Sequence, residues 1–274
     1  MSENGEFYRG KGVSPEELRR LNSLKRPNER SQELLNQLDM TNKNLLDVGA
    51  GSNPELGSYM KVRNGGYTAI DVNPAMVASM NEAFKSAGLP YESKQEDIVA
   101  GTSFASESFD VAHERFVLMN IKPETRAAAI QEMVRVAKEG VVLMEYDWST
   151  FSSTSHPELI ASVKQFVERV FTTTNTDPYM GGKLEAAVRE ALPDSSYTKE
   201  RFLEPESPTF LPEMLALMES IQANAKRYEE SLSDESQRNM AKMAGTMAGM
   251  LAVQLEKDQP SFIPPAIDSV TIRK

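Results

Sequence analysis

The sequence of 274 residues contains no cysteine and only two histidines, His113 and His156. Without cysteine there is no disulfide, thiolate metal site, iron–sulfur cluster or cysteine nucleophile. Two histidines do not supply a multi-histidine metal site, and they leave little material for a serine–histidine triad. We therefore expect no bound metal and no chemistry that depends on an activated thiol.

Basic residues and long apolar runs are also scarce. The 30 lysines and arginines stand against 40 aspartates and glutamates, so the formal net charge is -10. This excess repels a polyanion, and no lysine- or arginine-rich block offsets it. No run approaches the roughly 18 apolar residues of a membrane helix, and the first residues show no signal-peptide core. The sequence predicts a soluble cytoplasmic protein that binds neither nucleic acid nor membranes.

The central part of the chain alternates between short apolar runs and helical patterns. Strands are predicted at 45–48, 67–70, 91–95, 109–113 and 141–145. Helices are predicted at 73–86 and 123–138, with Gly140 turning the second helix into the following strand. Strands that alternate with helices form βαβ units, which build a parallel sheet with right-handed crossovers.

The flanks of this segment are mainly helical. Residues 1–13 form a polar arm, and a helix begins at Ser14-Pro15, followed by a short helix around 34–38. Further helices are predicted at 157–171, 183–192, 212–231 and 233–257, and further strands at 197–203 and 267–272. We expect one α/β domain at 41–274, an arm with covering helices at 1–40, and a helical insertion at about 205–260.

The most informative segment is the glycine-rich turn from Gly49 to Gly51, directly after the first strand. Glycine lets the backbone approach a ligand that a Cβ would block, and such turns lie at the ligand-binding switch point of doubly wound sheets. A dinucleotide fingerprint needs glycine or alanine at its third position, where this sequence has Pro54. Asp47, two residues before the first glycine, disfavours a pyrophosphate and favours a cation. The turn is therefore typical of a site for a cationic ligand without phosphate.

From Asp47 onward, a series of ordered motifs resembles the class I S-adenosylmethionine-dependent methyltransferases, in the small-molecule branch that includes ubiquinone-biosynthesis-type enzymes. The resemblance covers about residues 43–148. It implies an α/β fold with a doubly wound, mostly parallel seven-stranded sheet (the Rossmann-like methyltransferase fold) and S-adenosyl-L-methionine as cofactor. The implied reaction is methyl transfer to a small organic acceptor, with a specialised metabolite as one candidate, by in-line displacement at the sulfonium.

The resemblance also implies which residues bind the cofactor. The motif around the methionine part of the cofactor is matched by Asp47, Gly49 and Gly51. Asp71, with Val72 after it, matches the acid that accepts hydrogen bonds from both ribose hydroxyls. Asp97 and Ile98 stand where the family contacts adenine, and Glu114 stands where a backbone carbonyl meets the cofactor's ammonium group.

Residues for the acceptor are expected after the fourth and fifth strands. Arg115 and Phe116 follow the fourth strand, and the fifth runs into Glu145-Tyr146-Asp147-Trp148. One interpretation is a pocket in which aromatic faces and a carboxylate favour an amine or another cation. The other is a strand edge with solvated acids and a packed tryptophan. The predicted acceptor-binding residues are Tyr8, Arg115, Phe116 and Trp148.

Three side chains are candidates for a general base: Tyr146, Asp147 and His156. His156 precedes Pro157 and has a helix cap as its other interpretation. His113 lies within the fourth strand and is interpreted as a core residue. Tyr8 in the arm either contributes to the acceptor site or is simply exposed to solvent.

The helical segment 233–257 carries Met240, Met243, Met247 and Met250 at helical spacing. Core packing is the default expectation for such a stripe. A flexible wall around an apolar acceptor, or a contact between two copies of the chain in a homo-oligomer, are the alternatives.

Two other functions stay open at this stage. A nicotinamide-dependent oxidoreductase predicts stabilisation by NAD(H), whereas a methyltransferase predicts stabilisation by S-adenosylhomocysteine. A relative that binds S-adenosylmethionine without transferring methyl groups predicts tight cofactor binding and no turnover.

Overall fold

A seven-stranded sheet forms the centre of the fold. The computed structural model describes residues 14–231 and 233–274. The strands are β1 (Asn44–Val48), β2 (Gly66–Asp71), β3 (Glu92–Gln95), β4 (Phe109–Arg115), β5 (Ala137–Asp147), β6 (Tyr197–Phe202) and β7 (Ala266–Arg273). Their order is β3-β2-β1-β4-β5-β7-β6, in which β7 runs antiparallel to both of its neighbours. The predicted doubly wound, mostly parallel sheet is confirmed.

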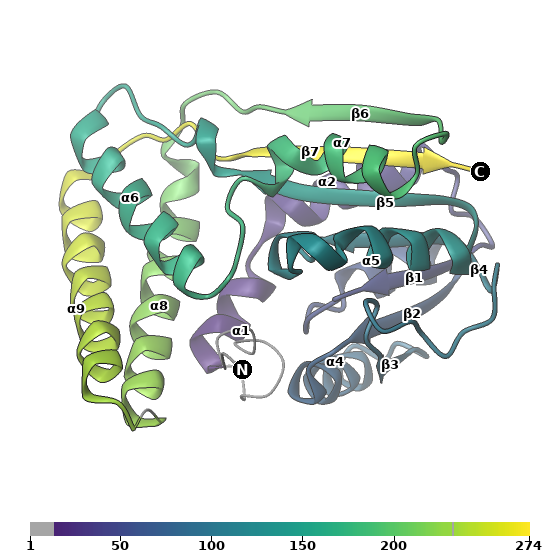
Figure 1. Ribbon diagram of the computed structural model, residues 1–274, viewed down its shortest axis with the longest axis horizontal. Helices are drawn as coiled ribbons and strands as arrows, with labels where there is room; N and C mark the ends of the chain where they lie inside the picture. Colours follow the sequence, from purple (N-terminus) through teal and green to yellow (C-terminus); the bar gives the residue numbers. More distant parts are fainter. Residues whose placement is uncertain (1–13, 232) are drawn as a thin grey trace.

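Helices cover both faces of the sheet and one of its ends (Figure 1). They are α1 (Pro15–Asn22), α2 (Lys25–Asn36), α3 (Glu55–Val62), α4 (Pro74–Ser86), α5 (Pro123–Val136), α6 (Pro157–Thr173), α7 (Met180–Ala191), α8 (Leu211–Ser231) and α9 (Glu235–Asp258). Helices α5 and α7 pack on the face that carries Leu46 and Leu143. Helices α2, α3 and α4 pack on the opposite face, against Leu45 and Met144. Apolar burial on both faces explains why the strands β1 and β5 contain consecutive apolar residues.

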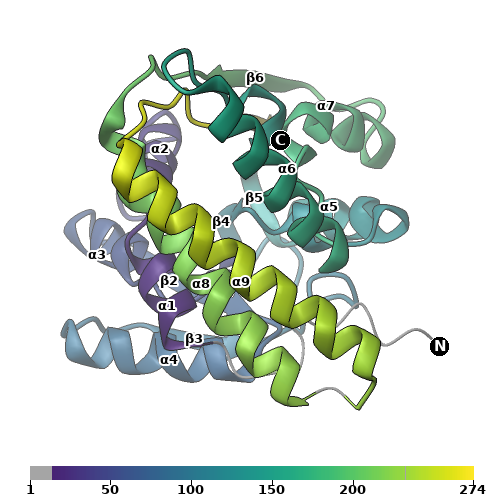
Figure 2. The same cartoon turned by 90° about the vertical axis from the view of Figure 1, so that its left-hand side faces the viewer.

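Helices α1, α6, α8 and α9 gather at the end of the sheet where β5 finishes, on the left of Figure 1. Figure 2 looks at this end and shows α9 crossing in front of α8. The two helices form a hairpin in the connection from β6 to β7, within the expected insertion. Ser220 on α8 donates a hydrogen bond of 2.5 Å to Glu17 on α1, which joins the hairpin to the N-terminal helices. None of the helices in residues 14–231 and 233–274 is both long and apolar enough to cross a membrane.

Several element boundaries differ from the sequence prediction. Helix α3 was not predicted: it is short, and its Gly57 is needed where a Cβ would lie 3.3 Å from Phe84 and from Leu89. The prediction that Gly140 turns a helix into a strand is wrong, because β5 begins at Ala137 directly after α5. Gly140 lies within β5, where a Cβ would come within 2.6 Å of the Ile272 carbonyl oxygen. Close approach to β7 is therefore the reason for this glycine.

The predicted core packing of the methionine stripe on α9 is wrong. Met240, Met243, Met247 and Met250 are between 44% and 69% exposed. The contact with α8 is made instead by small residues of α9, since Gly245 lies against Ala225 and Gly249 against Gln222. The methionines face away from this contact.

Candidate active site

The glycine turn after β1 lies at the carboxyl edge of the parallel strands. Gly49 and Gly51 have φ angles of 62° and 64°, a region that side chains with a Cβ rarely adopt. A Cβ on Gly49 would lie 2.4 Å from a Val117 methyl group, whereas a Cβ on Gly51 would meet nothing within 4 Å. Gly49 is thus required by packing against the loop after β4. Gly51 borders open space in which a ligand can approach the backbone.

Two acids follow the neighbouring strands at the same edge. Asp71 at the end of β2 accepts hydrogen bonds from the Gly51 amide at 3.2 Å and the Asn73 amide at 2.8 Å. Burial raises the pKa of the Asp71 carboxyl, and these backbone donors oppose the increase. Asp97 after β3 accepts from the Val99 amide at 3.0 Å. The structure brings both predicted acids to the edge that carries the glycine turn.

The residues that follow these two acids, Val72 and Ile98, are held in place by contacts within the protein. The Val72 carbonyl accepts a hydrogen bond from the Gln95 side chain at 3.2 Å, which joins the ends of β2 and β3. Ile98 is 6% exposed and belongs to the apolar core beneath α5.

Asp47 is held in a buried polar network rather than at the surface of the turn. The Tyr67 hydroxyl donates to one carboxylate oxygen at 2.6 Å, and His113 Nδ1 lies 2.8 Å from the other. A carboxylate only accepts, so Nδ1 carries a hydrogen, and Nε2 lies 3.0 Å from the Ser31 hydroxyl oxygen. Asp47 is 5% exposed and His113 is fully buried, which confirms His113 as a core residue. The predicted contact of Asp47 with a cofactor stays a prediction.

Ser31, His113 and Asp47 follow the order of a serine–histidine–acid triad, but they do not form a hydrolytic site. Ser31 lies on α2 and is fully buried, so a substrate does not reach its hydroxyl. Burial and the Asp47 charge raise the pKa of Tyr67 well above its ordinary value, which keeps this hydroxyl protonated. The network therefore ties α2 to the ends of β1 and β4.

Two aromatic rings meet where β4 and β5 end. Phe116 and Tyr146 stack with centroids 4.0 Å apart and planes 12° apart. Phe116 has a φ of 61°, so the chain turns sharply directly after β4. The Arg26 guanidinium lies 5.9 Å from the Tyr146 centroid. Arg115 points toward α2 instead, where it donates to the Asn28 side chain.

Two fully buried glutamates lie side by side on the opposite face of β4 and β5. Glu114 accepts hydrogen bonds from the amides of Val117 and Met144, each at 3.0 Å. Glu145 accepts from the Met119 amide at 3.0 Å, and its other carboxyl oxygen has no hydrogen-bond partner. Burial raises the pKa of Glu114 to about 7. Burial and the neighbouring Glu114 raise the pKa of Glu145 well above its ordinary value.

A known protein family matches the segment of the chain that contains the glycine turn. The family described as "Methyltransferase domain" matches residues 46–144, which contain β1 to β4 and most of β5. The match therefore includes the glycine turn, Asp71, Asp97 and the loop after β4. Residues 46–144 are a methyltransferase domain. The seven-stranded, mostly parallel sheet around this domain is the Rossmann-like methyltransferase fold.

Solved structures share the fold of this methyltransferase at low sequence identity. The cyclopropane synthase MmaA2 from Mycobacterium tuberculosis is 12% identical with a TM-score of 0.57, covering 100% of this chain and 99% of that chain. A putative sarcosine dimethylglycine methyltransferase from Galdieria sulphuraria is 16% identical with a TM-score of 0.51, covering 93% and 92%. The 4+2 cyclase SpnF is 17% identical with a TM-score of 0.55, covering 90% and 80%. A comparison with curated protein sequences gives no match.

The residues beside the glycine turn fit S-adenosylmethionine, the cofactor that the resemblance implies. Open space above Gly51 leaves room beside the turn, and Asp71 presents a carboxylate with acceptor sites beyond the two that backbone amides use. The sheet differs from a dinucleotide-binding sheet because β7 is inserted antiparallel between β5 and β6. These features argue against the nicotinamide-dependent alternative.

The interpretation of Glu145 and Asp147 as acids that attract an amine is contradicted by their surroundings. Glu145 is buried on the face covered by α5 and α7. Asp147 is 4% exposed, accepts from Ser149 and pairs with Arg201 of β6 at 2.7 Å. Trp148 is 4% exposed and packs edge-on against Phe171 and Tyr146. The second interpretation, a strand edge with a packed tryptophan and solvated acids, is right for Trp148. It is wrong for the two acids, which are buried and accept hydrogen bonds.

The three base candidates have different surroundings. Tyr146 is 8% exposed, and burial raises its pKa well above the ordinary value. Asp147 is ion-paired with Arg201. His156 stands before α6, where its carbonyl accepts the Ile160 amide and its ring contacts the Ser155 hydroxyl at 3.0 Å. Each stays a prediction, and Tyr8 lies outside the described residues.

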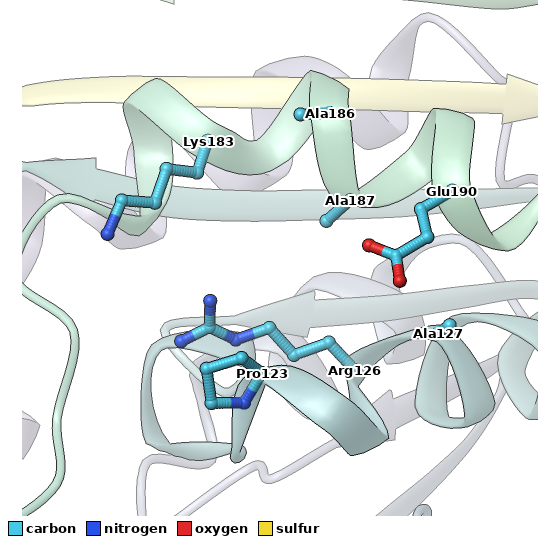
Figure 3. A pocket seen from close by; sticks show the side chains of 7 residues that line it. All are labelled: Pro123, Arg126, Ala127, Lys183, Ala186, Ala187 and Glu190. Atoms are coloured by element: carbon cyan, nitrogen blue, oxygen red, sulfur yellow. The ribbon is translucent and has the colours of Figure 1, made fainter.

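A separate groove lies between α5 and α7 on the far face of the sheet (Figure 3). Arg126 and Lys183 border it, and both pair with Asp177, at 3.2 and 2.8 Å. None of the predicted site residues lines this groove. The residues predicted to bind the cofactor lie at the strand ends instead.

Proposed function

We propose that this methyltransferase methylates a small organic acceptor held over Phe116, next to Tyr146, where β4 and β5 end. The observation that carries the proposal is the stacked ring pair beside the glycine turn. The loop after β4 connects the ring pair to the glycine turn, because Val117 of this loop packs directly on Gly49. When bound, S-adenosylmethionine supplies a methyl group activated by its sulfonium. The chain has to align the acceptor behind that carbon and keep water out.

The same proposal gives roles to the residues of the turn and the strand ends. Gly49 and Gly51 let the backbone follow the methionine part of the cofactor. Asp71 accepts hydrogen bonds from the ribose hydroxyls while its amide donors hold the carboxylate in place. Around adenine and the ammonium group we propose contacts from Val72, Asp97, Ile98 and the backbone carbonyl of Glu114. Asp47 acts as a positioning residue, since Tyr67 and His113 occupy its carboxylate.

Helices α1 and α8 are proposed as the cover of the acceptor site. Arg20 makes two hydrogen bonds of 2.7 Å to Glu17, and the same carboxylate accepts from Ser220. Arg19 adds an exposed ion pair with Glu219 at 3.1 Å. These contacts hold the hairpin insertion against the N-terminal helices. We accordingly propose 41–274 as the catalytic domain, with the N-terminal helices and the insertion as its cover.

The charges around the ring pair favour an acceptor that is uncharged at its reacting atom. Arg26 lies 5.5 Å from the Phe210 centroid and also faces Tyr146. Arg26 pairs with Glu204 and lies near Glu213, so the charges beside the ring pair offset one another. Glu145 and Asp147 are buried elsewhere. A flat apolar acceptor with a hydroxyl group fits this surface better than a cationic amine. The acidic net charge of -10 supports a small acceptor over nucleic acid, and biosynthesis of a specialised metabolite in the cytoplasm is part of the proposal.

Replacing Asp71 with alanine is expected to weaken binding of S-adenosylmethionine at least about tenfold, because charge-assisted hydrogen bonds to the ribose are lost. Isothermal titration calorimetry measures this directly. Asp71→Asn keeps an acceptor for the Gly51 amide and separates loss of the ribose contact from damage to the turn. Asp194→Ala at an exposed position is the matched control. Equal affinities of the wild type and both Asp71 variants would refute the assignment.

Replacing Phe116 with alanine is expected to raise the acceptor KM about tenfold while the affinity for S-adenosylhomocysteine changes less than twofold, since a stacking surface near the acceptor is removed. The acceptor is first found by screening phenols and amines of matched skeleton for release of S-adenosylhomocysteine. Phe104→Ala, which removes a partly buried phenylalanine packed against Phe109, is the control. Equal loss of cofactor and acceptor affinity would show that Phe116 only stabilises the loop. Faster turnover of the amines would contradict the proposed acceptor class.

A further inference from the structure

Helix α9 carries an exposed apolar stripe. Of the large hydrophobic side chains that are exposed in residues 14–231 and 233–274, five lie on this one helix. They are Met240 at 59%, Met243 at 69%, Met247 at 44%, Met250 at 68% and Val253 at 65% exposed. Spacings of three and four residues place them on one side of the helix. A contiguous apolar surface of this kind marks an interaction site.

The stripe does not face the acceptor site. Ala248 and Leu255 of α9 are fully buried, and Gly245 packs against Ala225 of α8. In Figure 2, α9 lies in front of α8, on the outside of the molecule. An acceptor bound at the strand ends is therefore separated from the stripe by the hairpin itself.

The stripe is arranged symmetrically about the middle of its helix. Helix α9 runs from Glu235 to Asp258, so its midpoint lies between Thr246 and Met247. Met243 and Met250 are equally distant from this point, and so are Met240 and Val253. A two-fold axis at the midpoint places the whole stripe of one copy against the whole stripe of an antiparallel second copy. Self-complementarity of this kind is what a two-fold dimer interface requires, and a foreign partner does not require it.

Charge at the helix ends selects the antiparallel arrangement. Glu235 stands in the first turn of α9 and Lys257 in its last turn. The charges of the first half of α9, Glu235, Arg238 and Lys242, sum to +1, and those of the second half, Glu256, Lys257 and Asp258, sum to -1. Antiparallel pairing brings each half next to the oppositely charged half of the partner, and it also aligns the helix dipoles favourably. Parallel pairing would place each charge beside its own equivalent. The end charges and the symmetric stripe point to the same geometry.

We propose that two copies of this chain dimerise through α9, packed antiparallel about a two-fold axis between Thr246 and Met247. The dimer joins helix α9 of one copy to helix α9 of the other. In each copy α9 packs on α8, one of the two helices proposed to cover the acceptor site. The proposal does not depend on the identity of the acceptor. It is a helix-to-helix contact of modest size, so we expect an equilibrium that depends on protein concentration.

Cysteine cross-linking tests the geometry, because the sequence has no cysteine that would interfere. With a rise of about 1.5 Å per residue, equivalent residues of the two copies are offset along the axis by about 1.5 Å at position 247, about 10 Å at 243 and about 20 Å at 240. A disulfide needs Cα atoms within about 7 Å. Met247→Cys is expected to form a disulfide-linked dimer under mild oxidation, and Met240→Cys is not. A mixture of Met243→Cys and Met250→Cys is expected to cross-link while neither variant does so alone.

Sedimentation velocity over a range of concentrations tests the dimer itself. The wild type is expected to dimerise, and Met247→Glu is expected to raise the dimer dissociation constant at least tenfold. Val62→Glu, at an exposed residue 81% accessible on α3, is the control that leaves the dimer intact. Circular dichroism checks that each variant is folded. A wild type that stays monomeric, or equal cross-linking of Met240→Cys and Met247→Cys, would overturn the proposal, and so would a stripe that binds only lipid vesicles.

Discussion

Replacing His113 with leucine is expected to lower the free energy of unfolding by about 3 kcal/mol. The imidazole bonds Asp47 at 2.8 Å and Ser31 at 3.0 Å, and all three side chains are buried. Leucine fills a similar volume but leaves the Asp47 carboxylate with one of its two partners and Ser31 without the imidazole. A buried polar group without its partner costs about 1–3 kcal/mol, more for a charged one. Urea denaturation followed by circular dichroism measures the loss.

A double-mutant cycle separates the network from simple packing. Tyr67→Phe removes the other hydrogen bond to Asp47, which is 2.6 Å long in the wild type. Because both substitutions act on one carboxylate, we expect their effects to be non-additive by at least about 1 kcal/mol. Ser31→Ala keeps the Asp47–His113 bond and is expected to cost only about 1 kcal/mol. A His113→Leu effect below that of Ser31→Ala would contradict the role assigned to the network.

The backbone of the cofactor site could be predicted because its signals are local. The turn at Gly49 needs positive φ angles and a close approach, and only glycine offers both at this position. The strand order then follows from the alternation of strands and helices, since βαβ units have a fixed handedness. Asp71 and Asp97 fall at strand ends, which all meet at one edge of a parallel sheet. Counting residues along the chain is enough to place these groups.

Side-chain directions could not be predicted in the same way, because they depend on the register between strands. Asp47 pairs with His113 across β1 and β4, residues that lie 66 positions apart in the sequence. The third and fourth members of the network, Tyr67 and Ser31, carry no motif that singles them out. The position of Asp47 just before the glycine turn suggested that it faces a cationic ligand, whereas the fold places its carboxylate against Tyr67 and His113.

The same limit explains the error over the acids at the end of β5. The alternation of Glu145 and Asp147 correctly separates them from Tyr146, but the face they occupy is covered rather than solvated. Arg201, which pairs with Asp147, belongs to β6 and reaches it across the edge of β7. The methionine stripe on α9 was predicted to be buried and is exposed. Apolar periodicity identifies the apolar face of a helix, but small residues on the other face decided which side packs on α8.

Replacing Glu145 with glutamine is expected to weaken the pH dependence of stability between pH 5 and 7. Burial raises the pKa of Glu114 from 4.5 to about 7, and burial with the neighbouring Glu114 also raises the pKa of Glu145 well above its ordinary value. Neither carboxyl forms an ion pair, and both accept backbone amides of the strand ends. The folded protein therefore retains two protons in a pH range in which the unfolded chain releases them.

The direction of the effect follows from this difference in proton binding. Below pH 4.5 both states are protonated, so the pair contributes its full stability. As the pH rises toward 7, the free energy of unfolding falls by up to about 1.4 kcal/mol per pH unit for each carboxyl. Above about pH 7 Glu114 ionises in the folded state as well, and its contribution to the slope ends. Stability from the pair is thus lost with rising pH.

Glutamine at position 145 resembles the protonated glutamate, because it keeps an oxygen for the Met119 amide and carries no titratable proton. Relative to the wild type, Glu145→Gln is therefore expected to lose less stability as the pH rises from 5 to 7. Denaturant titrations at half-unit pH steps measure both curves, and Glu158→Gln at an exposed position is the matched control. Parallel curves for the wild type and Glu145→Gln would mean that Glu145 is ionised in the folded state. In that case the unpartnered oxygen of Glu145 could not be explained by a retained proton, and the loop that carries Phe116 would be held by the charged form of the pair.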